Sequence, residues 1–263
     1  WIEIIKYIKK ELRGILIYIC LYEHSTIDFA LSLNPDGIKL NSSDLTNPYV
    51  LKKISKINIP INLSVGSSNM KEINYALKFF KKKNINIMYG FQAFPTPISA
   101  IKLSNIKFLK EKLKFNIGYQ DHCEGGDIAG IYFPATAIGL GASIIEKHIT
   151  IDRSNTKFDQ ESALEPKEFS KFVNIIRNIE MTIETKTKPL SFSKYDLQYR
   201  KFQKKTFVYS KDLKKNQLLT NDDIIFIRSN KEVLSVFSIK KFINKKLKRA
   251  VKKFDIINPR DFI

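Results

Sequence analysis

The sequence GYQDH at residues 118–122 is followed, one helix length later, by IIEKH at residues 144–148. Each short run predicts a buried β-strand, and each ends in a histidine. Consecutive parallel strands of a β/α structure end at the same rim, so we expect His122 and His148 to face one site. Two neutral imidazoles placed there would bind a divalent metal that keeps positions open for water or substrate. For either histidine alone, an ordinary hydrogen-bonded strand end is the alternative.

Strand-like and helix-like runs alternate through the first 184 residues. The expected strands are residues 15–20, 37–40, 59–64, 85–89, 116–119 and 143–148. The expected helices are residues 26–33, 48–55, 70–82, 98–114, 127–140 and 166–184, after a first helix near residues 1–12. Strands that are nearly all apolar are typical of a parallel sheet covered by helices. The predicted fold class is therefore α/β, a (β/α)8 TIM-type barrel with about six units in this chain and the first two absent.

The alternation stops after residue 184. Residues 185–201 are polar, contain a proline and predict a linker. Residues 202–263 carry short β-like runs at 206–209 and 224–227 and a helical stretch near 239–245, which predict a small β-rich second domain.

The charge, hydropathy and cysteine content of the chain limit its possible partners and location. The 263 residues carry 45 Lys and Arg against 26 Asp and Glu, a net charge of +19. The lysines are spread along the whole chain instead of forming one basic stripe, so we expect attraction to acidic substrates and no nucleic-acid partner. No apolar stretch approaches the roughly 20 residues of a membrane span. The two cysteines, Cys20 and Cys123, favour a reducing, cytoplasmic location, and Cys123 is either a reactive thiol or, as we expect, a spectator near the site.

Several motifs together resemble the sialic acid (N-acetylneuraminate) synthase family. They are DGIKLNS at 36–42, GYQDH at 118–122, GLGASIIEKH at 139–148, TIDR at 150–153 and SALEP at 162–166. The family joins a barrel to a C-terminal antifreeze-like (SAF) domain, and both halves match here in the same order. The resemblance implies a partial synthase barrel in residues 1–184 and an SAF domain in residues 202–263.

The resemblance also implies a reaction. The family condenses phosphoenolpyruvate with an N-acetylated hexose, N-acetylmannosamine or a diacetamido hexose, to give a nonulosonic (sialic-type) acid and phosphate. A divalent metal, Mn2+ or Mg2+, polarises the sugar aldehyde as a Lewis acid. On this basis His122 and His148 are the expected protein ligands of the metal.

Other roles follow by the same resemblance. Asp159 matches an acid that handles sugar hydroxyls or a metal-bound water. Asp44 stands where the family usually has a glutamate and is a candidate general acid/base for the water that attacks C2. Lys39 and Ser42 match groups that bind phosphate and carboxylate, whereas Lys39 taken alone would be an ordinary solvated lysine.

Three substrate-binding positions depart from the family pattern. Gln92 and Phe94 replace a small polar residue and a tyrosine, and Gln120 replaces a serine. The loop after His122 is also a few residues longer than usual. These changes bear on which sugar is the substrate. Synthases of neuraminic, legionaminic and pseudaminic acid share the same core motifs, so the motifs alone do not distinguish the sugars.

The small domain is expected to cover the partner's barrel in a homodimer. Arg228 matches an arginine that reaches the partner's sugar, and Phe202 matches a nearby aromatic residue. The alternatives are a surface arginine and a core phenylalanine.

The family's first two strands bring a glutamate and a phosphate-binding lysine that have no counterpart here. One alternative function is therefore a catalytically incomplete remnant that binds glycans or a partner. Another is a related condensation or aldolase reaction on the same barrel, which a preference for an unacetylated sugar phosphate would favour.

Overall fold

The computed structural model describes residues 1–263 apart from 81–83, 91–92, 156–157, 184–187 and 229–235. The chain divides into two compact units, Trp1–Glu184 and Thr185–Ile263, and each is described by itself. Among the described residues, no helix combines the length and the apolar character that crossing a bilayer requires.

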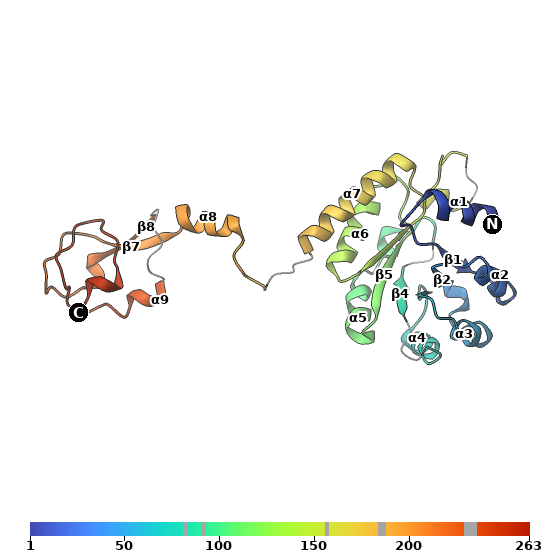
Figure 1. The fold of residues 1–263 in the computed structure, drawn as a ribbon, viewed down its shortest axis with the longest axis horizontal. Helices are drawn as coiled ribbons and strands as arrows, with labels where there is room; N and C mark the ends of the chain where they lie inside the picture. Colours follow the sequence, from blue (N-terminus) through green and yellow to red (C-terminus); the bar gives the residue numbers. More distant parts are fainter. Residues whose placement is uncertain (81–83, 91–92, 156–157, 184–187, 229–235) are drawn as a thin grey trace. The chain divides into compact units, whose positions relative to one another are not determined.

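The first unit is built on a parallel sheet whose strands lie side by side in chain order (Figure 1). The strands are β1 (Tyr18–Leu21), β2 (Gly37–Leu40), β3 (Ile61–Ser64), β4 (Ile85–Tyr89), β5 (Asn116–Asp121) and β6 (Ile144–Lys147). Helices connect them along the chain, because neighbouring parallel strands need a crossover connection. The described residues thus form a curled six-stranded sheet with β1 and β6 at its edges, while closure to eight strands stays a prediction.

The α-helices that the described residues form around this sheet are α1 (Ile2–Glu11), α2 (Ile27–Ser32), α3 (Pro48–Ile54), α4 (Met70–Leu77), α5 (Ser104–Leu113), α6 (Ala129–Gly139) and α7 (Pro166–Ile183). Their first residues follow from local chemistry. The Asn47 side chain caps α3 with Pro48 in its first turn, and Asn69 and Glu72 form a capping box at α4. Helix α5 begins six residues later than expected because residues 98–100 form a separate 3-10 turn and Ile101 is extended.

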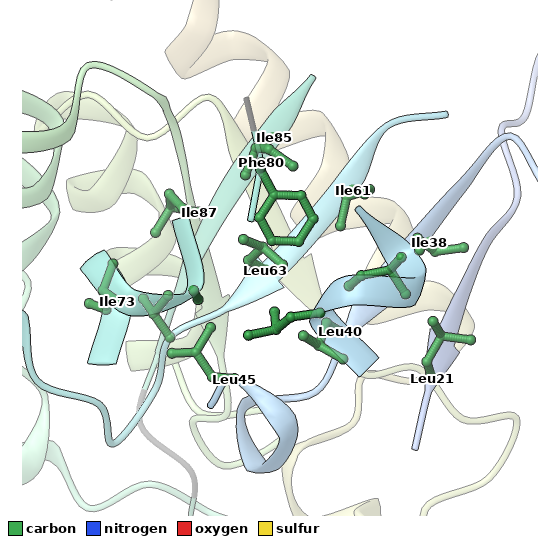
Figure 2. Close-up of a cluster of buried hydrophobic side chains, with 14 of the residues drawn as sticks. Leu21, Ile38, Leu40, Leu45, Ile61, Leu63, Ile73, Phe80, Ile85 and Ile87 are labelled. Atoms are coloured by element: carbon green, nitrogen blue, oxygen red, sulfur yellow. The ribbon is translucent and has the colours of Figure 1, made fainter. Parts of the chain in front are cut away.

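The core lies between the sheet and its helices. Alternate strand residues such as Ile38, Leu40, Ile61, Leu63 and Ile87 are fully buried there (Figure 2). The intervening residues point to the opposite, inner face, where the amides of Asn62, Asn86 and Asn116 form a hydrogen-bonded row across β3, β4 and β5. A two-residue period therefore separates an apolar packing face from a polar inner face.

The second unit contains α8 (Lys194–Gln203), the antiparallel pair β7 (Lys205–Tyr209) and β8 (Ile224–Arg228), and α9 (Val236–Ile239). Helix α8 lies largely within the expected linker. It is capped by Ser193 and Asp196 and is exposed along most of its length, including Tyr195, Tyr199 and Phe202, which recur at helical spacing. The expected helix at 239–245 is wrong: α9 ends at Ile239, and Asn244 has a positive φ of 65° that ends any helical run.

Leu63 tests where the core sits. Its side chain is fully buried between sheet and helices, so Leu63→Ala should lower the free energy of unfolding by about 2–5 kcal/mol. Ile151, which is 90% exposed, is the matched control, and Ile151→Ala should change it by less than about 0.5 kcal/mol. Urea denaturation followed by circular dichroism measures both, and equal losses would contradict this placement of the core.

Candidate metal and substrate site

The two histidines lie side by side directly after neighbouring strands. Asp121 and Lys147, the last residues of β5 and β6, are paired in register, and a histidine follows each of them. The imidazole centroids of His122 and His148 are 5.2 Å apart with their planes at 52°. His122 is buried, whereas the His148 side chain is 31% exposed. The structure therefore brings the two expected metal ligands together.

Loops distant in sequence hold the backbone of both histidines. The carbonyl of His122 accepts hydrogen bonds from the Thr96 amide (2.8 Å) and the Ser162 hydroxyl (2.9 Å). The carbonyl of His148 accepts from the Leu164 amide at 2.9 Å. The SALEP run at 162–166 therefore serves a geometric purpose, because two of its residues fasten the two histidines.

Phe94 and Asp159 complete the group around the imidazoles. The Phe94 ring lies 4.4 Å from the His122 ring and 5.7 Å from the His148 ring, centroid to centroid. The Asp159 carboxylate is 3.8 Å from Nδ1 of His148 and is half-exposed. An aromatic ring thus lies against both imidazoles, and a carboxylate lies close to one of them.

The electrostatics keep His148 neutral. Burial lowers the pKa of His148 below its usual value, and Lys39 and Lys147 act in the same direction. The carboxylates of Asp159 and Glu146 oppose this and raise the pKa, but burial prevails. A neutral imidazole keeps the nitrogen lone pair that a metal ligand needs.

A second cluster lies on the same inner face. Lys39 of β2 contacts the Glu146 carboxylate of β6 at 2.5 Å, and the same Glu146 oxygen accepts from the Gln120 side-chain amide at 3.0 Å. That amide also donates to the Ser64 hydroxyl at 3.2 Å. Glu146 is an acid beside His148 to which the sequence predictions assign no role. Its position two residues before His148 was the available signal, because residues two apart on a strand share a face.

The other residues that the sequence predictions assign to substrate binding or catalysis do not lie in one group. Ser42 and Asp44 form a 3-10 turn after β2, where the Asp44 carboxylate accepts a hydrogen bond from the side-chain amide of Asn47 at 2.7 Å.

The remaining predicted residues lie elsewhere. Gln92 lies outside the described residues. Phe202 and Arg228 lie in the second unit and are exposed, so the alternative of a core phenylalanine is wrong. Cys123 is buried and burial raises its pKa to about 12, as expected of a spectator thiol.

The residues present fit a divalent ion only as a partial ligand set. Within the described part of the chain, no group of three His, Cys, Asp or Glu side chains is placed to hold a metal. His122 and His148 could supply two nitrogens, and Asp159 could hold a bound water. The remaining positions would come from water or substrate, as in a site that is open for catalysis.

The pKa of His148 gives a pH prediction. Protonation removes the lone pair, so metal binding should be lost as pH falls, at a pH below the ordinary histidine value of about 6.5. Asp159→Asn should lower the pKa of His148 further, because it removes a carboxylate that raises it. NMR titration of the imidazoles measures this, with Asp28→Asn on α2 as control. A rise of the pKa in Asp159→Asn would contradict the electrostatics described.

Known proteins are related to this chain in sequence. Residues 2–188 match the NeuB family. N,N'-diacetyllegionaminic acid synthase of Campylobacter jejuni is 30% identical over 208 residues, which cover 77% of this chain and 60% of that protein. The chain thus spans less than two thirds of this relative's length.

Solved structures agree in fold. The N-acetylneuraminic acid (sialic acid) synthetase of Leptospira borgpetersenii, crystallised with citrate, superposes with a TM-score of 0.66 at 28% identity, over 75% of this chain and 69% of that one. A putative spore coat polysaccharide biosynthesis protein E from Chromobacterium violaceum superposes with a TM-score of 0.81 at 17% identity, over 100% of this chain and 79% of its own. The family match extends over more than half of the residues, and this chain therefore belongs to the NeuB family.

Proposed function

We propose that this chain is the catalytic portion of a synthase that condenses phosphoenolpyruvate with an N-acetylated hexose to a nonulosonic acid. The observation that carries the proposal is the pair of adjacent imidazoles, one held neutral, on the same sheet face as Lys39. Family membership and the named activities of relatives support it. A diacetamido hexose is the proposed sugar class, because the legionaminic acid relative is among the most similar proteins.

Individual residues of the chain would have separate roles in binding and orienting the two substrates. Lys39 would bind the phosphoenolpyruvate anion, which would have to share or displace the Glu146 carboxylate that now contacts it. The Gln120 amide, held by Ser64 and Glu146, would keep Glu146 in place. Phe94 would pack against the sugar and exclude water beside the imidazoles. Asp159 would orient sugar hydroxyls, and Ser42 and Asp44 would act at the end of β2.

A divalent metal, Mn2+ or Mg2+, would supply Lewis acidity toward the sugar carbonyl oxygen. His122 and His148 would hold it. Eight-stranded closure of the barrel, an antifreeze-like fold for the second unit, a homodimer in which Arg228 and Phe202 approach the partner's sugar, and a cytoplasmic location remain part of the proposal.

Phosphate release from phosphoenolpyruvate tests the proposed function. The assay contains Mn2+ and either N-acetylmannosamine or a 2,4-diacetamido hexose, and is run on this chain and on a version extended upstream in the same reading frame. His148→Ala and Lys39→Ala should each reduce release by about a hundredfold or more, through loss of metal and of anion binding. Lys52→Ala, an exposed lysine on α3, should leave the rate unchanged.

The other outcomes separate the alternatives. Absence of turnover in both versions, with Mn2+ binding intact, would contradict the synthase and favour a module that binds glycans. Faster turnover with an unacetylated sugar phosphate would favour the related condensation or aldolase instead.

A further inference from the structure

A buried ion pair lies directly beneath the two imidazoles. Nζ of Lys147 is 2.5 Å from Oδ2 of Asp121, and the two side chains are 1% and 0% exposed. Asp121 and Lys147 immediately precede His122 and His148 on β5 and β6. Because successive side chains of a strand alternate, the pair occupies the helix-facing side of the sheet and the imidazoles occupy the inner side.

Both members of this pair have further polar contacts, and the helix above them leaves space for the lysine ammonium. The second carboxylate oxygen of Asp121 accepts from the Tyr119 hydroxyl at 3.2 Å, and the Cys123 carbonyl lies 3.5 Å from the Lys147 ammonium. Helix α6 crosses over the pair at Gly130, where a Cβ would stand 3.1 Å from Nζ of Lys147 and 3.7 Å from Oδ2 of Asp121. A glycine in the first turn of α6 thus leaves the room that the lysine head occupies.

Stability alone does not account for such a pair. Desolvating two charges costs about as much as their attraction returns, and well-packed apolar replacements are often neutral or stabilising. In the observed register Asp121 is directly opposite Lys147, so the pairing of the two charges is matched to the register of the strands. A slip of one residue would turn a histidine to the wrong face of the sheet.

We propose that the Lys147–Asp121 pair is a positioning device that sets the register and separation of His122 and His148, and thereby the affinity of the site for a divalent cation. This inference rests on the proposed function for its metal, but the ring geometry it concerns is a property of the chain. Lys147 also lowers the pKa of His148 through its charge, but the positioning that we propose acts through the strands that carry the pair and lead into the histidines.

The test replaces both charges by near-isosteres, Asp121→Asn with Lys147→Met. Histidine-labelled protein gives few signals, because the chain has three histidines. In the unaltered chain a nuclear Overhauser contact should join the rings of His122 and His148, whose centroids are 5.2 Å apart. In the double variant the intensity of this contact should fall by at least half. The affinity for Mn2+, measured by electron paramagnetic resonance, should fall about tenfold. The midpoint of urea denaturation should be retained.

Two further variants keep the test decisive. Gly130→Ala presses on the Lys147 head without removing a charge, and should weaken the ring contact and Mn2+ affinity to a smaller degree. The control is Asp28→Asn with Lys53→Met, which removes the exposed pair (2.7 Å) between α2 and α3 and should change neither readout. His24 serves as the internal reference.

The possible failures are distinguishable. An unchanged ring contact in the double variant, or its absence from the unaltered chain, overturns the positioning inference. Loss of the contact in the double variant supports the inference even if the unaltered chain binds no Mn2+, a result that would count against the proposed metal site alone. A fall in Mn2+ affinity with the ring contact unchanged would also overturn it, because the pair would then act by charge and not by position.

Discussion

The alternation of side chains along parallel strands is the constraint on which the first unit depends. Along β5, β6 and the residue after each, it sends Gln120, His122, Glu146 and His148 to the inner face, while Tyr119, Asp121 and Lys147 go to the helix-facing side. Residues of the candidate site and residues that pack under the helices are thus adjacent in sequence but lie on opposite faces of the sheet. Since a slip of one residue would exchange the two faces, correct register between β5 and β6 is a requirement for the site and not only for the core.

The site is stiffened from outside the strands as well. The carbonyls of both histidines are held by residues from the loops around Thr96 and Ser162. Two loops far apart in sequence therefore fix the point where β5 and β6 end. Such support suits a group that must hold two ring nitrogens in place, because small displacements of ligands are costly in an open metal site.

Local and periodic features could be predicted from the sequence, and long-range contacts could not. The strands β2 and β4 are predicted with their observed bounds, because each is a short apolar run between turn residues. The histidine pair is predicted because parallel strands end at one rim. The Lys39–Glu146 contact joins residues 107 apart and arises from the curvature of the sheet, which no local pattern records. Helix α8 escapes prediction although Tyr195, Tyr199 and Phe202 recur at helical spacing, because polar and charged residues surround this short pattern and make it look like a linker.

Charge balance gives a physical reason for the proposed metal. The charged groups described around the imidazoles are Lys39, Glu146 and Asp159, which sum to one negative charge when both histidines are neutral. The Lys147–Asp121 pair adds nothing to this sum. A phosphate-bearing anion would be repelled by such a site, although the chain's net charge of +19 attracts it from a distance. One divalent cation would change the local sum from −1 to +1. The same cation that activates a carbonyl would then also remove the electrostatic repulsion of the anionic substrate. Loss of either histidine should therefore impair binding of phosphoenolpyruvate as well as the condensation step.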